Sequence, residues 1–121
     1  MTKEELKKRT KTFAIRTFKF LMEIEKNKAV DVISYQLFKS SSSVAANYRA
    51  VCRGKSDSDF LNKLKIVDEE ADESLFWLEF IQELEIDCNK TELEKLIKEA
   101  DELVSIFSAG IKTIKSRNNK N

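Results

Sequence analysis

The sequence lacks histidine and proline entirely, and only two of its 121 residues are glycine. A β-sandwich or an α/β fold needs turn-forming residues at many corners, and this chain has almost none. Without histidine, the Ser-His and Cys-His nucleophile systems are excluded, as is the Glu-x-x-His pair of di-iron bundles. No glycine-rich phosphate loop is present. These absences argue against an enzyme and against a bound cofactor or metal.

Cysteine and long apolar runs are also scarce. Cys52 and Cys88 lie far apart without the spacing of a metal site, which predicts two reduced thiols in a cytoplasmic protein. The first residues are charged and no apolar run follows them, so we expect no signal peptide. No stretch approaches the ~20 apolar residues of a membrane span. The chain is therefore expected to be soluble and to have no membrane partner.

The residues that are abundant are those of amphipathic helices, since 36% of the chain is charged and 41% is hydrophobic. The net charge is only +1, but residues 3–55 are basic and residues 57–90 are strongly acidic. Complementary charge between neighbouring helices is the simpler explanation of this pattern. A basic face for an anionic partner is the alternative.

Hydrophobic periodicity predicts four long helices, over residues of about 2–26, 30–53, 57–84 and 91–115. Short connections between helices of this length force neighbours to run antiparallel. The sequence therefore predicts one all-α domain, 1–121, folded as an antiparallel up-down-up-down four-helix bundle.

Local signals mark the ends of these helices. Thr2 and Thr91 each begin a capping box, and either Ser56 or Asp57 suits the start of the third helix. Gly54 is expected to end the second helix. The run of serines at 40–43 continues the helical phase on both sides, so it predicts close helix packing rather than a linker.

A basic corner is predicted where the second helix ends and the third begins. Its members are Arg49, Arg53, Lys55 and Lys63. Arg49 and Arg53 share a helix face, where like charges repel unless an acid or a phosphate lies between them. The favoured interpretation is an internal ion pair with the third helix, for which the candidate acids are Asp57, Asp59 and Glu70. Contact with nucleic acid is the alternative.

Three polar residues, Asn47, Glu70 and Glu73, are expected to have structural roles. Asn47 lies one position from the core line at Tyr48, which is typical of a buried hydrogen-bonding residue. Glu70 and Glu73 belong to the acidic block 68–73. Because this block has no imidazole partners, it predicts a salt-bridged helix face rather than a metal site.

Two groups of apolar residues exceed what one bundle needs to bury. They are Ile15, Phe18 and Met22 in the first helix, and Phe76, Trp77 and Phe80 in the third. Apolar surface of this size usually marks an interface, and a wider core is the alternative. We therefore predict that the protein forms a homo-oligomer through these residues.

The stretch 36–84 carries a distinctive series of motifs. Gln36-Leu37 and a Lys/Ser run are followed by SVAANYRA, S-x-x-DF-x-x-KL and EEADESLFWLE. This series resembles the 23S rRNA intervening-sequence proteins, to which the accessory protein of diversity-generating retroelements is related. The resemblance implies a four-helix bundle, a homopentamer, and a link to RNA or to a nucleic-acid enzyme.

Under this resemblance, the basic corner falls in the motif region. A second basic strip is then Lys7, Lys8, Arg9, Lys11 and Arg16. The expected function is a non-catalytic, homo-oligomeric helical scaffold that contacts rRNA, another nucleic acid or a nucleic-acid enzyme. A protein–protein adaptor without a nucleic-acid role is the alternative, because acidic residues in the third helix repel phosphate.

Overall fold

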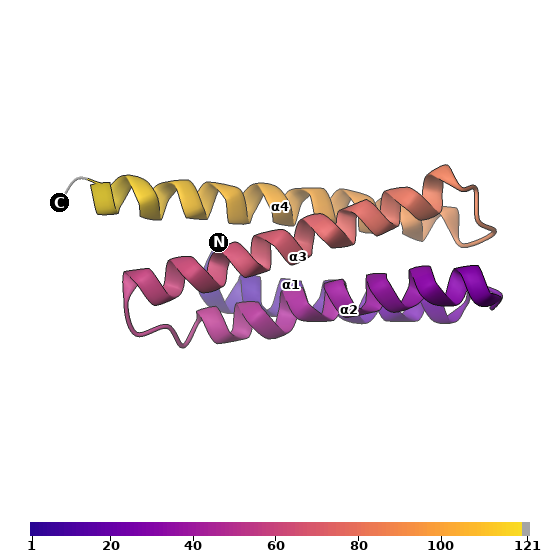
Figure 1. Cartoon of the computed structure of the whole chain (residues 1–121), viewed down its shortest axis with the longest axis horizontal. Coiled ribbons are helices and arrows are strands. Elements are labelled where there is room, and N and C mark those ends of the chain that lie inside the picture. The colour runs from indigo at the N-terminus through magenta and orange to yellow at the C-terminus, as the bar shows by residue number, and fades with distance from the viewer. Residues whose placement is uncertain (120–121) are drawn as a thin grey trace.

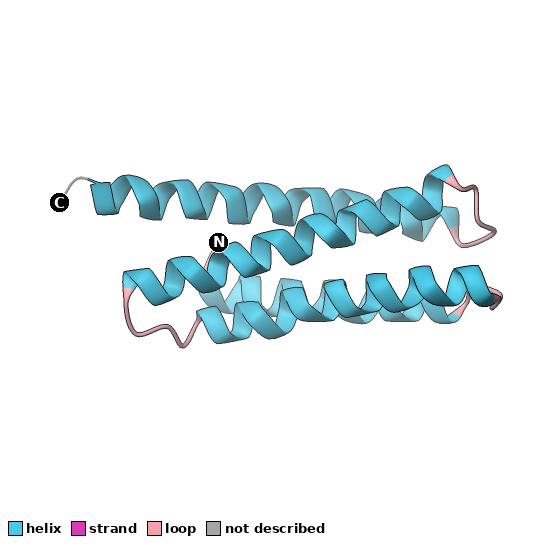
Figure 2. Cartoon of the chain, in the orientation of Figure 1, coloured by secondary structure: helices cyan, strands magenta, loops and turns pink. Residues whose placement is uncertain are grey.

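The computed structural model describes residues 1–119, which form four long helices and no strand (Figure 2). α1 spans Lys3–Met22, α2 spans Lys28–Val51, α3 spans Asp57–Glu83 and α4 spans Lys90–Asn119. The expected all-α, four-helix architecture is confirmed. The first helix ends earlier than expected, at Met22, and the last continues further, to Asn119.

Each helix packs against its neighbours in sequence, and α1 also packs against α4 (Figure 1). Among residues 1–119, the backbones of the diagonal pairs α1–α3 and α2–α4 do not approach each other closely. The α1–α4 seam is the sparsest of the four. The bundle is therefore closed by a seam between the two helices that are furthest apart in sequence.

The core lies along the stripes that the helical period predicts. Phe13, Leu37, Leu78 and Phe107 are essentially inaccessible to solvent, and each comes from a different helix. Tyr48 of α2 packs beside Phe107 of α4, with ring centroids 5.8 Å apart. Because these side chains remove apolar surface from water at all levels of the bundle, they supply its main stabilisation.

Small polar residues allow α2 and α3 to approach closely. Ser40, Ser41 and Ser74 are fully buried, and the hydroxyls of Ser40 and Ser74 lie 3.0 Å apart across the two helices. The Ser40 hydroxyl also donates to the carbonyl of Leu37. The interpretation of the serine run as a helix-packing surface is thus confirmed.

Each helix begins at a side-chain cap. Thr2, Asn27, Ser56 and Asn89 accept hydrogen bonds from backbone amides three residues later, at 2.9–3.1 Å. The sequence placed the last cap at Thr91, which is wrong. Asn89 directly precedes α4, and its side-chain oxygen accepts a hydrogen bond from the backbone amide of Glu92 in the first turn. Asparagine is also a stronger N-cap residue than threonine.

The ends of α2 and α3 differ from the expectation that glycine stops a helix. α2 ends at Val51, and neither this helix end nor Gly54 uses a left-handed backbone conformation. The left-handed residue is Glu85, with φ of 56°, and the amide of Ile86 then reaches the carbonyl of Ile81. This bond pattern ends α3 as a Schellman motif without glycine.

Candidate interface on the α1–α2 face

Two arginines of the predicted basic strip hold α1 against α4. Arg9 donates two hydrogen bonds to Glu99, at 2.7 and 2.6 Å, and also contacts Glu102. Arg16 donates two to Glu92, at 3.0 and 2.8 Å. These bonds raise the pKa of both guanidiniums, chiefly through hydrogen bonding to the carboxylates, and lower the pKa of Glu92. The side chains of Arg9 and Arg16 are therefore engaged in ion pairs that join α1 to α4.

The lysines of the same strip face the other flank of α1. Lys7, Lys8 and Lys11 line a groove between α1 and α2, where they are joined by Arg49. The groove encloses about 650 Å³, and Glu4 is its one acidic residue. Lys7 pairs with Glu4 at 3.3 Å. The groove therefore keeps an excess of positive charge.

The floor of this groove is made of small residues. Ala14 of α1 and Ser42, Ala45 and Ala46 of α2 line it, and Ile15 lies at its apolar end. Small side chains leave the groove open between the lysines of α1 and Arg49 of α2. A chain carrying negative charge can therefore reach the cations without a steric obstacle.

The acids proposed as partners of Arg49 and Arg53 are engaged elsewhere or remain apart. Asp57 pairs with Arg117 of α4 at 3.0 Å, and Asp59 pairs with Lys63 at 3.2 Å. Neither Arg49 nor Arg53 forms an ion pair with any residue that the structure describes. The favoured interpretation of an internal ion pair for these two arginines is therefore wrong.

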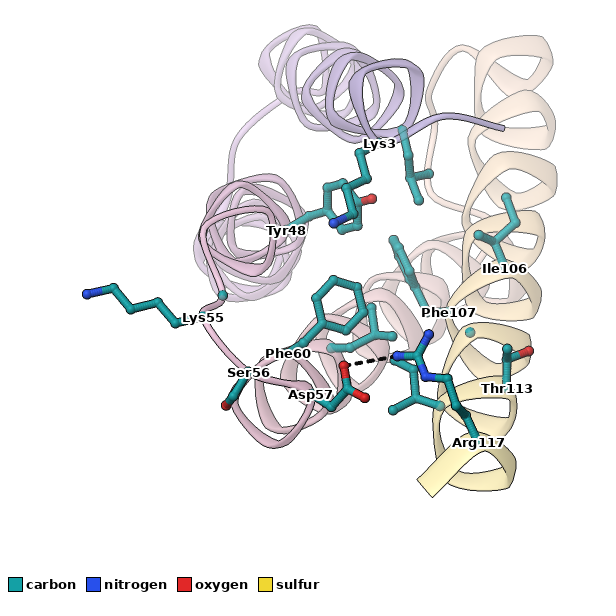
Figure 3. A pocket seen from close by; sticks show the side chains of 15 residues that line it. Lys3, Tyr48, Lys55, Ser56, Asp57, Phe60, Ile106, Phe107, Thr113 and Arg117 are labelled. Atoms are coloured by element: carbon teal, nitrogen blue, oxygen red, sulfur yellow. Dashed lines mark hydrogen bonds and ion pairs between the residues drawn. The ribbon is translucent and has the colours of Figure 1, made fainter. Parts of the chain in front are cut away.

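The predicted basic corner does not form a single cluster. Arg49 joins the lysines of α1, whereas Lys63 is tied to Asp59 within α3. Lys55 lies in the α2–α3 loop, at the rim of a different cavity, and its side chain points away from that cavity (Figure 3). Arg53 is exposed on the last turn beyond α2. Only Arg49 shares a groove with other cations.

The three polar residues occupy different environments. Asn47 is half-buried and donates from Nδ2 to the carbonyl of Ser43 at 2.9 Å. Burial, and then repulsion from Glu73, raises the pKa of Glu70. Glu73 is exposed. In residues 1–119, neither glutamate forms an ion pair, so the predicted salt bridges across this face are absent there.

An apolar patch continues the groove toward the α1–α2 turn. Ile15, Phe18 and Met22 are 46%, 41% and 63% exposed. Phe18 contacts Phe38 of α2, with ring centroids 5.0 Å apart, and Tyr35 is also exposed. The α1–α2 face is therefore apolar at one end and basic at the other.

The aromatic residues of α3 form a separate cluster. Trp77 packs edge-on against Phe76 and Phe80, at centroid distances of 4.9 and 5.5 Å. Phe76 is 52% exposed, whereas Trp77 and Phe80 are half-buried against the core. The indole Nε1 of Trp77 is buried without a hydrogen-bond partner in the described structure. The six predicted interface residues thus lie in two separate groups, on helices that are diagonal to each other in the bundle.

The sequence analysis did not predict that Tyr35 and Phe38 belong to the apolar patch. Both lie off the core stripe of α2 and are three residues apart, which is the same signal that identified Ile15 and Phe18 in α1. The reading also missed a cavity of about 590 Å³ at the end of the bundle, because residues from all four helices line it (Figure 3). In that cavity, burial and then Cys52 raise the pKa of Tyr48 to about 12.

Within residues 1–119, no cluster of three histidine, cysteine or acidic side chains could hold a metal ion. None of the helices described there is long and apolar enough to cross a membrane. The features that stand out are a basic groove and an apolar patch on one face.

Comparison with protein families gives a match over residues 2–109, to the model described as 23S rRNA-intervening sequence protein. The chain belongs to this family. The matched range contains the groove, the apolar patch and the α3 aromatic cluster, and it ends within α4. The resemblance that the motifs in 36–84 suggested is confirmed.

A solved structure has the same fold as this family member. It is a protein of unknown function from the S23 ribosomal protein family of Bacteroides thetaiotaomicron, 31% identical in sequence, with a TM-score of 0.76. The alignment covers 88% of this chain and 97% of that one. A comparison with curated proteins finds no match.

Proposed function

We propose that this protein is a non-catalytic helical scaffold that contacts RNA through the groove between α1 and α2. The observation that carries the proposal is the separation of its cations. Arg9 and Arg16 are neutralised by α4, whereas Lys8, Lys11 and Arg49 line one groove without an acidic partner in the described structure. The name of the family, which refers to 23S rRNA, supports RNA as the anion.

The number of cations in the groove sets how strongly RNA binding should depend on salt. Each phosphate that a cation neutralises releases counterions, so affinity falls with salt in proportion to the number of contacts. The three unpaired cations, together with Lys7, which pairs with Glu4, correspond to a slope of log K against log salt of roughly −2 to −4. The exposed acids of α3, such as Glu69 and Asp72, repel phosphate and orient the RNA toward the α1–α2 face.

The test is fluorescence anisotropy with a structured fragment of 23S rRNA over a range of salt. We expect salt-dependent binding that weakens in the double variant Lys11→Ala/Arg49→Ala, which removes one groove cation from each helix. The matched control is Lys98→Ala/Lys112→Ala, which removes the same charge from exposed positions on α4. Absent binding, salt-insensitive binding, or an equal loss in both double variants would contradict the proposal.

We also propose that a second copy of the chain covers the apolar patch, and that the scaffold is a homo-oligomer, such as a pentamer. The support is the group formed by Ile15, Phe18, Met22, Tyr35 and Phe38 on adjoining helices, because exposed apolar patches usually mark interfaces. Sedimentation equilibrium measures the mass directly. A concentration-independent monomer would refute this part of the proposal.

Two single variants locate the interface. Phe18→Glu places a charge in the α1–α2 patch, and Phe76→Glu places one in the α3 cluster; both side chains are about half exposed. Dissociation by Phe18→Glu alone assigns the interface to α1–α2. Dissociation by Phe76→Glu alone assigns it to α3 instead.

A protein–protein adaptor is the second candidate, and the acidic face of α3 favours it. Glu69, Asp72 and Glu73 are exposed there and repel phosphate. A pull-down with the purified protein separates the two functions. Recovery of a specific protein that survives nuclease treatment, without RNA, supports the adaptor; recovery of RNA supports the scaffold proposed first.

A further inference from the structure

One end of the bundle has three walls instead of four. α1 has 20 residues and α4 has 30. The two helices are antiparallel and Arg9 pairs with Glu99, so Lys3 lies about level with Ser105. The turns of α4 beyond that level extend past the start of α1, as the yellow end of the ribbon shows in Figure 1.

The missing wall leaves a cavity of about 590 Å³ at this end. Phe60 of α3 and Phe107 of α4 point into it from two sides, and Tyr48 of α2 closes the inner end (Figure 3). Small-molecule pockets typically enclose roughly 300–1,000 Å³, and most of their lining is apolar. The cavity therefore has the size and the lining of a ligand pocket.

The mouth of the cavity carries an excess of positive charge. Lys3 and Arg117 line it, together with the single carboxylate of Asp57, whereas the Lys55 side chain at the rim points away. The ammonium of Lys3 lies 5.2 Å from the centre of the Phe60 ring, which keeps it over the apolar interior. Arg117 and Asp57 are more than half exposed, so their ion pair is weak and can open for another anion.

We propose that this open end binds an amphipathic organic anion. Its apolar body lies between Phe60 and the side of α4 that carries Ile106 and Gly110, and its acid group lies between Lys3 and Arg117. The charge of the mouth selects an anion over a neutral or cationic molecule of the same length. This site shares no residue with the α1–α2 groove, so it goes beyond the scaffold function proposed above.

The two glycines provide specific reporters for this site. Gly54 and Gly110 are the only glycines in the chain, and both line the cavity. Backbone amides of glycine are well separated from others in a ¹H–¹⁵N correlation spectrum. Titration with decanoate should shift both glycine signals saturably. Decyltrimethylammonium, which has the same chain and the opposite charge, should not shift them.

Two variants test the location and the role of charge. Lys3→Glu reverses one charge at the exposed start of α1 and should weaken decanoate binding roughly threefold to tenfold. Thr113→Trp places a large side chain at the exposed edge of the cavity and should abolish binding. Lys98→Glu on the outer face of α4 is the matched charge control and should leave it unchanged.

The outcomes separate this proposal from its rivals. Glycine signals that stay fixed while those of Ala14 and Ala45 move would show that decanoate binds the α1–α2 groove, and would overturn the proposal. Equal shifts with the cationic amphiphile would overturn the anion preference. Because RNA binding plays no part in the assay, its failure leaves the proposed scaffold function untouched.

Discussion

The hydroxyl of Ser74 in α3 lies 3.0 Å from the hydroxyl of Ser40 in α2, and both side chains are fully buried. Removing one partner leaves a buried polar group without this bond, so Ser74→Ala should lower the free energy of unfolding by about 1 kcal/mol. The double variant Ser40→Ala/Ser74→Ala should cost less than the sum of the single variants. Urea denaturation measures each value, and strict additivity would show that the hydroxyls do not interact.

Arginines on α1 and α2 should differ in their effect on stability. Arg9→Ala removes paired hydrogen bonds to Glu99 that are largely shielded from solvent, so we expect a loss of about 1–2 kcal/mol. Arg49→Ala removes an exposed side chain and should change stability by less than about 0.5 kcal/mol. Urea midpoints of the two variants provide the comparison. Equal losses would contradict the assignment of Arg49 to the free basic groove.

The Arg16–Glu92 pair should make stability depend on pH. Hydrogen bonds from Arg16 hold the pKa of Glu92 below its usual value in the folded state. A lowered carboxyl pKa stabilises the fold above the pKa of the unfolded state, and this contribution disappears as the pH falls through the folded pKa. Glu92→Gln should therefore destabilise the protein at pH 7 and have little effect in acid.

The control for this experiment is Glu94→Gln, which changes an exposed glutamate in the same turn of α4. Its effect should be smaller at neutral pH. A Glu92→Gln effect that persists unchanged at acidic pH would show that the carboxylate charge is not the source of the stabilisation.

Asp68 should behave in the opposite way. Burial, and to a smaller extent the charges of Asp72 and Glu69, raises its pKa, although Ser108 donates a hydrogen bond to it. Ionisation of a carboxyl whose folded pKa is raised destabilises the fold as the pH rises. Asp68→Asn should therefore increase stability at pH 7 and make no difference in acid. Asp72→Asn is the control at an exposed position. Thermal unfolding of both variants at neutral and acidic pH measures the difference in stability.

Glu85 should be a site where glycine stabilises the protein. Its φ of 56° places a side-chain residue in the left-handed region, which costs roughly 1–2 kcal/mol for most amino acids. Glycine adopts this conformation freely, so Glu85→Gly should raise stability by about 1 kcal/mol. Glu85→Ala keeps the Cβ atom and should give no such gain. Equal urea midpoints for the two variants would refute the strain argument.

The helices could be predicted because their signals are local. The apolar stripe that contains Leu37 and Val44, and the caps at Thr2 and Ser56, depend only on residues a few positions apart. The cap of α4 was assigned to Thr91 alone, although asparagine at position 89 suits an N-cap as well. Gly54 was also wrongly expected to cap the end of α2. Its position just after the helix suits a C-cap glycine, but its backbone does not adopt the left-handed conformation of such a cap.

The candidate site could be predicted only in part. The sequence identified the cations of α1 but treated them as one strip. Whether Arg9 meets Glu99 depends on how α1 is rotated toward a helix 90 positions away. The same rotation sends Lys8 and Lys11 toward Arg49. A one-dimensional pattern cannot distinguish the two flanks of a helix until its neighbours are placed.

The α1–α4 seam also has a consequence for folding and opening. The other three seams join helices that follow one another along the chain, and such contacts form rapidly. Forming the α1–α4 seam closes the longest loop of the chain. Ion pairs such as Arg9–Glu99 lie across this seam. We therefore expect α1 to dock last and to be released first, and high salt to increase hydrogen exchange along α1 before α2 and α3. Half of the basic groove would then be lost while most of the bundle remains folded.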